Sequence, residues 1–358
     1  MIRVMIMAGG TGGHVYPALS IADALRERNV DVVWLGTKRG LESRLVPEAG
    51  LRLECLDASA WMGTSRRRRI VLPFVLLRAL WQALNIVGRW QPSVVLGMGG
   101  FAAGPGGLAA WLMRRPLVIH EANARAGRTN RLLAPLSKKI LSGFSKVEKF
   151  PASTIWTGNP VRPDIALVPP MHERELDDRQ PVRVLVLGGS QGAEVLNQLI
   201  PEALSKCNSA RQLRVVHQSG LGKDAALIAR YNALSVEAVV SPFIDDMANA
   251  YAQADLVISR AGAMTVSELS TVGRPAILIP YPYAADDHQY ANAASLVKAG
   301  AAIVIRQQEL DPLRLAGEID RFTGNRDLLR QMAIAAHSLA KADATDQVVA
   351  HCLGVAYA

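Results

Sequence analysis

The chain of 358 residues is long enough for two domains, at roughly 150 residues per domain. Half of its residues are hydrophobic and only 20% are charged, which predicts a packed globular protein and excludes a disordered one. The net charge of +9 indicates an anionic partner, and nucleic acid, nucleotide phosphates and an anionic membrane all qualify.

The cysteines and the hydropathy indicate the cellular compartment and the relation to membranes. Cys55, Cys207 and Cys352 lie far apart without paired spacing, which excludes a zinc cluster and a disulfide framework and favours a reducing cytoplasm. The N-terminus lacks the charged and apolar regions of a signal peptide, and no apolar stretch reaches the roughly 18 residues that span a bilayer. We therefore expect a soluble or peripheral protein.

Strand-like and helix-like segments alternate along the chain. Apolar runs, often β-branched, predict buried strands at 2–7, 32–35, 94–98, 117–120, 182–187, 213–217, 238–240, 256–259, 276–280 and 302–305. Helix-like segments lie between them, among others at 17–27, 194–207, 265–272 and 286–299. Continuous apolar strands that alternate with helices predict an α/β fold with parallel sheets covered on both faces.

The layout of the first half is repeated in the second. Segment 184–193, of sequence VLVLGGSQGA, repeats the strand, glycine turn and helix start that open the chain. Two doubly wound domains therefore fit better than one large sheet, and the prolines of segment 159–163 place the join there. We expect a first domain over 1–160 and a second over 161–341. Because open parallel sheets bind ligands beyond the carboxyl ends of their strands, two such sheets facing each other would hold the site in a cleft between them.

Glycine-rich turns follow three of the predicted strands. The turn at 9–13 ends at His14, and it has the features of an anion-binding loop whose histidine can transfer protons near neutral pH. A tight turn with a solvent-facing His14 is the alternative. The turn at 97–107 also fits close packing of strand and helix, and the third lies at 188–192. No Gly-Lys-Ser/Thr follows, and 32–38 offers no acidic side chain, so a Walker loop and a dinucleotide site are disfavoured.

A basic and apolar stretch begins with the four arginines at 66–69 and continues as a predicted helix with two apolar stripes. One stripe comprises Ile70, Phe74, Leu77, Trp81 and Leu84, and the other comprises Leu72, Leu76, Ala79, Ala83 and Val87. If one stripe packs on the sheet, the other favours docking on anionic lipid, and segment 111–115 would extend that surface. A buried helix with a solvated arginine corner is the alternative. Nucleic acid is disfavoured because the arginines adjoin aliphatic residues rather than interleaved aromatic ones.

The second domain has its clearest candidate site at 255–268, where we expect a strand, a turn of small residues and a helix that begins near Ala263. Such a helix start suits a diphosphate, and Glu268 would accept hydrogen bonds from the two hydroxyls of a ribose. The alternative for Glu268 is a charge that stabilises the helix N-terminus. Gln289 can donate to and accept from sugar hydroxyls. The aspartates of segment 286–288 are interpreted as helix caps rather than metal ligands, because adjacent residues on one helix point in different directions.

Taken together, these stretches resemble the MurG family, the peptidoglycan glycosyltransferases that make lipid II at the bacterial inner membrane. The similarity covers almost the whole chain and depends on the order and spacing of the motifs. The matching motifs lie at 9–14, 97–107, 120–123, 157–162, 188–193, 243–247, 263–268 and 287–292.

The resemblance implies a GT-B fold, with two Rossmann-like domains around a cleft and a C-terminal helix, about 342–358, that packs back on the first domain. It implies transfer of N-acetylglucosamine from UDP-N-acetylglucosamine to the 4-hydroxyl of the muramoyl sugar of lipid I, the undecaprenyl-diphosphate-linked acceptor. It also implies a peripheral protein at the cytoplasmic face of the inner membrane, with anionic lipids and with cell-wall and division proteins as partners.

The resemblance also implies roles for individual residues. The family holds the donor in its second domain, so Ile244 would line the uracil site through its backbone, Glu268 would bind the ribose and Gln289 the sugar. The residues implied around the diphosphate and adjoining groups are Arg162, Ser190, Ala263, Met264, Thr265, Val266 and Ser267. The residues implied from the first domain are Thr11, Gly12, Gly13 and Asn123. The glycine turns of that domain would take the acceptor's diphosphate.

Inversion at the anomeric centre requires a base for the acceptor hydroxyl and stabilisation of the departing diphosphate. His14 is the candidate base, with a carboxylate as base and a positioning role for His14 as the alternatives. Helix N-terminal amides and Arg162 would stabilise the leaving group without a bound metal. No Asp-x-Asp element follows a strand, so no cofactor is expected to be required, while a role for Mg²⁺ stays open. The alternative functions are another GT-B transferase or epimerase that uses a UDP-sugar, and a nucleotide-sugar-binding protein without turnover.

Overall fold

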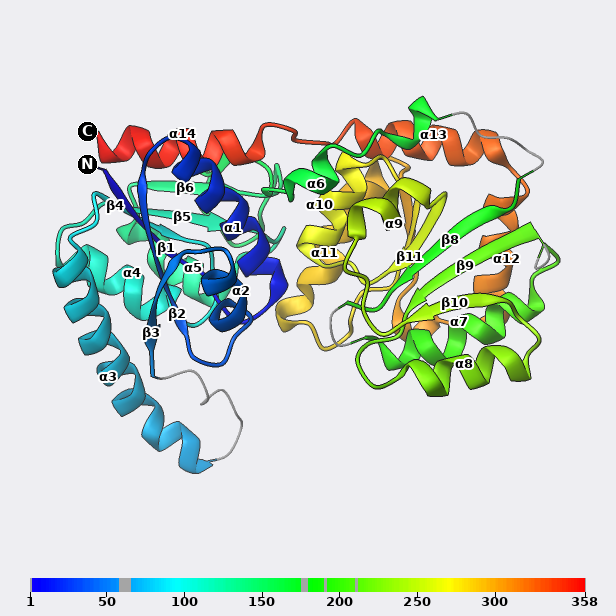
Figure 1. The fold of residues 1–358 in the computed structure, drawn as a ribbon, viewed down its shortest axis with the longest axis horizontal. Helices are drawn as coiled ribbons and strands as arrows, with labels where there is room; N and C mark the ends of the chain where they lie inside the picture. Colours follow the sequence, from blue (N-terminus) through cyan, green and yellow to red (C-terminus); the bar gives the residue numbers. More distant parts are fainter. Residues whose placement is uncertain (1, 58–65, 175–179, 190–191, 210–211, 358) are drawn as a thin grey trace. The chain divides into compact units, whose positions relative to one another are not determined.

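The computed structural model describes residues 2–57, 66–174, 180–189, 192–209 and 212–357, and for 66–71 and 285 it describes the backbone alone. The chain divides into two compact units, unit 1 with Met1–Arg162 and Lys341–Ala358, and unit 2 with Pro163–Ala340. Each unit contains one parallel sheet with helices on its faces (Figure 1). The expected pair of doubly wound parallel-sheet domains is confirmed.

The sheet of unit 1 has the strand order β3-β2-β1-β4-β5-β6-β7, with every pairing parallel. Its strands are β1 Arg3–Met7, β2 Asp31–Thr37, β3 Arg52–Leu56, β4 Val94–Gly97, β5 Leu117–Glu121, β6 Lys139–Ser142 and β7 Ile155–Trp156. β1, β2, β4 and β5 confirm predicted strands, whereas the sequence did not predict β3, β6 and β7. β3 is a half-polar strand at the sheet edge, and β7 consists of two residues, both of which are exposed. Neither strand therefore has the pattern of a buried strand.

Helices cover both faces of this sheet (Figure 1). The helices on one face are α1 Gly12–Glu27, α2 Glu42–Glu48 and α14 Ala344–Ala356. Those on the other face are α3 Arg66–Trp90, α4 Ala103–Leu112 and α5 Arg128–Leu133, with the 3₁₀ turn η1 Ala134–Leu136. Successive residues of a strand point to opposite faces, so Val4 and Ile6 enter the first core while Met5 and Met7 enter the second.

The sheet of unit 2 has the order β10-β9-β8-β11-β12-β13 and is also parallel throughout. Its strands are β8 Val182–Leu187, β9 Leu213–Gln218, β10 Ala238–Ser241, β11 Leu256–Ser259, β12 Ala276–Leu278 and β13 Ala302–Val304. Its helices are α6 Pro163–Ala166, α7 Glu194–Lys206, α8 Asp224–Ala233, α9 Met247–Gln253, α10 Ala263–Thr271, α11 His288–Lys298, α12 Pro312–Thr323 and α13 Arg326–His337. The 3₁₀ turns are η2 Met171–Glu173, η4 Ala285–Asp287 and η5 Gln307–Glu309. All six of these strands lie where apolar runs predicted them.

α14 is separated in sequence from the rest of unit 1 by the whole of unit 2. It packs against α1 and β4, and Val348, Val349 and Cys352 join the core beneath α1. Within the part of the chain that the structure describes, no helix combines the length and the apolar composition needed to cross a membrane.

The packing of α14 yields a stability prediction. Val348 is fully buried, and Val348→Ala leaves a cavity that should lower the free energy of unfolding of unit 1 by about 2 kcal/mol. Differential scanning calorimetry measures the shift. Gln347→Ala, at an exposed position of the same helix, is the matched control and should change stability by less than about 0.5 kcal/mol. Equal shifts in the two variants would contradict a structural role for α14.

Candidate active site

The first glycine turn follows β1 and leads directly into α1. Thr11 is the residue before the helix, and its carbonyl oxygen accepts hydrogen bonds from the amides of His14 and Val15 at 3.1 and 3.2 Å. The helix therefore begins at Gly12, within the glycine turn itself and before the predicted helix-like segment 17–27. The first-turn amides of Gly12 and Gly13 have no acceptor within the helix, which is the arrangement that binds anions.

The turn after β4 packs directly against the turn after β1. A Cβ atom added to Gly100 would lie 2.3 Å from the carbonyl oxygen of Gly9, and one added to Gly99 would lie 2.8 Å from the imidazole ring of His14. The imidazole of His14 therefore rests on Gly99 and is half-buried rather than fully facing solvent. Elsewhere in segment 97–107, Gly106 approaches Met7 and Gly107 approaches Leu133, so the alternative of close packing between strand and helix holds for these glycines.

Arg162 lies next to α1. Its guanidinium group is 5.3 Å from the centre of the Tyr16 ring, two residues beyond His14, and both residues belong to unit 1. Arg162 thus contacts the helix that carries His14, and it belongs to unit 1 rather than to the unit that carries Glu268.

Asn123 lies in a loop organised by one buried carboxylate. Glu121, the last residue of β5, accepts hydrogen bonds from the backbone and side-chain amides of Asn123 at 3.0 and 3.2 Å. Its other oxygen accepts from the amide of Gly127 and the side chain of Asn130, both at 2.9 Å. Sequence reasoning named Asn123 and missed Glu121. The signal available was an acidic residue at the end of a buried strand, two residues before a candidate ligand.

His120, next to Glu121, is a structural residue. It is fully buried, its Nε2 lies 2.9 Å from the carbonyl oxygen of Gly158, and burial lowers the pKa of its imidazole. Asn159 in turn donates to the carbonyl oxygen of Ala122 at 3.0 Å. These contacts join the motifs at 120–123 and 157–162.

In unit 2, the first turn of α10 carries most of the predicted donor residues. Gly262 precedes the helix and accepts from the amide of Val266 at 2.9 Å, so Ala263, Met264 and Thr265 form the open first turn. The hydroxyl of Ser267 donates back to the carbonyl oxygen of Ala263 at 3.0 Å.

Glu268 is held by a tyrosine that sequence reasoning missed. The hydroxyl of Tyr251, on α9, donates to Oε2 of Glu268 at 2.9 Å. Tyr251 is fully buried, and its backbone carbonyl oxygen accepts from Arg274, which is buried as well. The carboxylate is thereby fixed one turn into α10, and its half-buried position leaves it accessible to a ligand.

Gln289, on α11, and the aspartates before it are the next candidates in unit 2. Oε1 of Gln289 accepts from the amide of Tyr281 at 2.9 Å, so its amide nitrogen is the end that can donate to a sugar hydroxyl. The capping interpretation for the aspartates is wrong for Asp287, which precedes α11 without a side-chain cap and instead pairs with Arg306 at 3.4 Å. Asp286 and Asp287 both adopt the left-handed conformation, at φ 54° and 55°.

Two further candidates lie on loops of unit 2. Ile244 is half-buried between β10 and α9, where Asp246 caps the helix by accepting from the amide of Asn249. The turn after β8 brings Gly192 against the carbonyl oxygen of Ser219. Ser190 lies outside the described residues.

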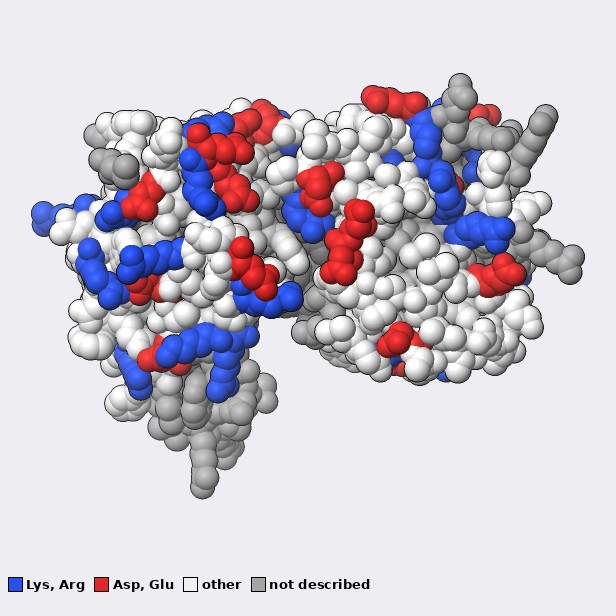
Figure 2. Space-filling view, viewed as in Figure 1, with Lys and Arg blue, Asp and Glu red and all other residues white. Residues whose placement is uncertain are grey.

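α3 presents an apolar face to solvent. Phe74, Leu77 and Trp81 expose 71%, 64% and 65% of their surface, and Trp111 and Leu112 of the neighbouring α4 are about half exposed. We call these five residues the α3 surface. Of the other stripe, Ala79, Ala83 and Val87 are fully buried, whereas Leu72 and Leu76 nearer the start of the helix are exposed, so this stripe packs inward only over its second half. The alternative of a wholly buried helix is therefore wrong, because Phe74, Leu77 and Trp81 face solvent, while the side chains of 66–69 lie outside the described residues. Figure 2 shows basic side chains gathered beside this helix.

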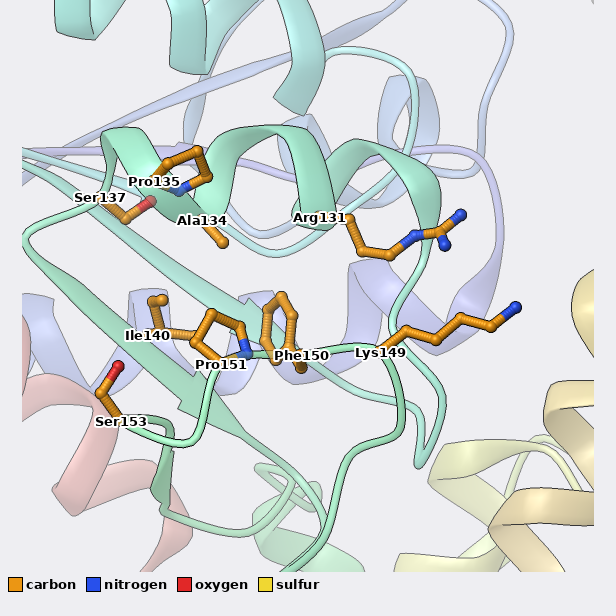
Figure 3. A pocket seen from close by; sticks show the side chains of 9 residues that line it. All are labelled: Arg131, Ala134, Pro135, Ser137, Ile140, Lys149, Phe150, Pro151 and Ser153. Atoms are coloured by element: carbon orange, nitrogen blue, oxygen red, sulfur yellow. The ribbon is translucent and has the colours of Figure 1, made fainter.

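A hollow of about 660 Å³ lies elsewhere in unit 1, between the α5–η1 segment and residues 149–153 (Figure 3). The side chains of Arg131 and Lys149 extend at one end of it. Its lining includes none of the predicted site residues. Across the described residues, no group of three or more His, Cys, Asp or Glu side chains is placed to hold a metal ion.

Comparison with known proteins defines the class. Residues 4–142 match the N-terminal domain of glycosyltransferase family 28, and residues 183–348 match its C-terminal domain. The chain therefore belongs to glycosyltransferase family 28, and its two parallel-sheet units form the GT-B fold.

Individual relatives define the family more closely. The chain is 49% identical over 99% of both chains to a Nitrosococcus oceani protein named UDP-N-acetylglucosamine–N-acetylmuramyl-(pentapeptide) pyrophosphoryl-undecaprenol N-acetylglucosamine transferase. A protein of the same name from Alkalilimnicola ehrlichii is 49% identical over 98% of both chains. The crystal structure of MurG from Acinetobacter baumannii matches with a TM-score of 0.83 and 38% identity, covering 99% of this chain and all of that one. The chain is thus a member of the MurG family.

A more distant likeness concerns the fold alone. A UDP-N-acetylglucosamine 2-epimerase structure matches with a TM-score of 0.67 at 15% identity, covering 97% of this chain and 94% of that one. The fold by itself does not separate transferases from epimerases.

The contact between Tyr251 and Glu268 yields a prediction for nucleotide binding. Tyr251→Phe removes one hydrogen bond to the carboxylate and should weaken UDP binding about fivefold, or about 1 kcal/mol, while Glu268→Ala should weaken it further. Isothermal titration calorimetry with UDP measures both. Tyr231→Phe is the matched control, because it removes a tyrosine hydroxyl in the same unit that contacts His217 rather than Glu268. It should bind UDP as the wild type does. UDP affinity that is unchanged in Glu268→Ala would refute the proposed contact with the ribose.

Proposed function

We propose that the chain transfers N-acetylglucosamine from UDP-N-acetylglucosamine to the 4-hydroxyl of the muramoyl sugar of lipid I, which gives lipid II for peptidoglycan synthesis. The observation that carries this proposal is the 49% identity, over nearly the full length of both chains, to a transferase named for this reaction. The structure supports it with polar groups at the carboxyl edge of each sheet, where parallel sheets bind their ligands.

Unit 2 is proposed to hold the donor. The first-turn amides of α10 would receive the diphosphate, Glu268 would accept hydrogen bonds from the ribose hydroxyls, and Gln289 would donate to the sugar. Ile244 would contact the uracil through its backbone. Ser190 and the other residues of the α10 turn would surround the diphosphate and its adjoining groups.

Unit 1 is proposed to hold the acceptor and the base. The first turn of α1 would meet the acceptor diphosphate, and His14 would take the proton of the attacking hydroxyl. In one displacement the acceptor oxygen bonds to the anomeric carbon, the bond from that carbon to the diphosphate oxygen breaks, and UDP departs with the bonding electrons. Amides at the α10 N-terminus and Arg162 would stabilise the charge on the leaving group. No resident cofactor is needed for this step, and turnover with and without Mg²⁺ measures whether the ion contributes.

The central experiment tests turnover and the base together. Purified protein, UDP-N-acetylglucosamine and a lipid I analogue are incubated, and the disaccharide product is followed by chromatography. We expect His14→Ala to bind UDP as the wild type does and to lose turnover by about 10² to 10⁴-fold, the usual contribution of a general base. His351→Ala, a substitution on α14, is the control.

Each other outcome has a defined meaning. Full turnover in His14→Ala would remove His14 from the mechanism. Conversion of UDP-N-acetylglucosamine without the acceptor would favour an epimerase, and binding of UDP without any conversion would favour a nucleotide-sugar-binding protein.

We further propose that the chain docks on the cytoplasmic face of the inner membrane through the α3 surface. Exposed aromatic and aliphatic side chains beside basic ones suit insertion into a leaflet of anionic lipid. This placement would bring unit 1 to its lipid-linked acceptor, and cell-wall and division proteins are proposed as further partners there.

Vesicle binding tests the membrane proposal. Burial of Phe and Trp side chains contributes about 1.5 to 3 kcal/mol each, so Phe74→Ser combined with Trp81→Ser should lower binding to phosphatidylglycerol vesicles by about a hundredfold or more. Co-sedimentation measures it. Leu313→Ser, at an exposed position of α12 in unit 2, is the control and should bind as the wild type does. Wild-type protein that does not sediment with the vesicles would contradict the proposal.

A further inference from the structure

Glu42 is a buried carboxylate for which the proposed reaction has no role. It is the first residue of α2 and has no exposed surface, although it belongs to a residue type that is rarely buried without several polar partners. Its side chain points into the turn after β1, which carries Thr11 to His14.

Both oxygens of this carboxylate accept hydrogen bonds from backbone amides. Oε2 accepts from the amide of Gly10 at 2.9 Å, and Oε1 accepts from the amide of Thr37 at 3.0 Å and from its hydroxyl at 2.6 Å. The neighbouring Leu41 adds a contact, because its amide donates to the carbonyl oxygen of Gly10 at 3.4 Å. Segment 41–42 thus holds Gly10 at both its N–H and its C=O.

Glycines from three separate segments leave the room that this carboxylate fills. A Cβ atom at Gly9 would lie 2.4 Å from Oε1 of Glu42, one at Gly36 would lie 2.7 Å from its Cγ, and one at Gly40 would lie 1.9 Å from its Oε2. A side chain at any of these positions would displace the carboxylate. The turn at 9–13 is therefore shaped around an anion that the chain itself supplies.

The constraint on Gly10 extends to His14. Gly10 has a φ of 91°, which glycine adopts readily and other residues rarely do. It is followed by Thr11, whose carbonyl oxygen receives the amide of His14, and the imidazole rests on Gly99. Because the Gly10 amide is already bonded to Glu42, an acceptor diphosphate would meet the amides of Gly12 and Gly13 instead.

We propose that Glu42 is a positioning residue for the acceptor side of the transfer: it fixes the turn at 9–13 and so sets the place of His14 and of the first-turn amides of α1. This inference rests on the proposed function, in which that turn meets the acceptor.

Glu42→Gln is the sharpest test. The amide is nearly the same size but accepts hydrogen bonds through one oxygen only, so its NH₂ group must face the N–H of either Gly10 or Thr37. The turn should shift while the core stays filled. Gly40→Ala perturbs the same contact and keeps the charge, because the added methyl group meets the carboxylate. Glu48→Gln removes an exposed carboxylate from the same helix and is the matched control.

The readouts separate positioning from stability. With the lipid I analogue, we expect Glu42→Gln and Gly40→Ala to lower kcat at least about tenfold and to raise the KM for the acceptor, since small displacements of catalytic groups cost this much or more. The affinity for UDP should stay within about twofold of wild type, because Glu268 and the α10 turn, which are proposed to hold the nucleotide, lie in unit 2. Thermal unfolding reports how much protein is folded.

The outcomes are distinct from those of the proposed function. Wild-type protein that makes no disaccharide overturns the proposed function. Active wild type with kcat and acceptor KM unchanged in Glu42→Gln overturns the inference alone. A loss of turnover in both variants that only matches a loss of folded protein, without a change in acceptor KM, also overturns it, because Glu42 would then act on stability alone.

Discussion

The architecture of the site depends on how closely neighbouring turns approach at the carboxyl edges of the two sheets. In unit 1, the turn after β4 touches the turn after β1 at Gly100 and Gly9, and in unit 2 Gly192 meets the backbone of Ser219. At these contacts a hydrogen atom fits and a methyl group does not. The glycines that make a phosphate loop recognisable are therefore required first for packing, and the amides that remain open belong to the helix that follows each turn.

Buried carboxylates hold several of these turns and loops in place. Glu42 holds the turn after β1, Glu121 holds the loop after β5, and Asp255 pairs with Arg174 and Arg183 at the start of β11. Each accepts from several donors, which offsets the desolvation of a charge that would otherwise be costly to bury.

The sequence predicts what depends on local pattern and misses what depends on long-range partners. Strands buried on both faces, such as β1 and β8, are continuous apolar runs and were predicted, whereas the half-polar edge strand β3 was not. Candidate residues such as Glu268 and His14 follow from motifs. Their supports do not, because Tyr251 and Glu42 are remote in sequence from the groups they hold, and no local pattern marks the pairing. The pairing of Asp287 with Arg306 was missed for the same reason, because Arg306 lies on another segment of the chain.

The position of α14 has a consequence for how the chain acquires its structure during synthesis. Unit 2 is one continuous segment, so it can complete its core as soon as residue 340 has emerged from the ribosome. Unit 1 cannot complete its core at that point, because Val348, Val349 and Cys352 belong to that core and follow unit 2 in the sequence. Its seven strands, by contrast, are synthesised before unit 2. The nascent first unit therefore lacks the helix that packs against α1 and β4 until the second unit has been translated.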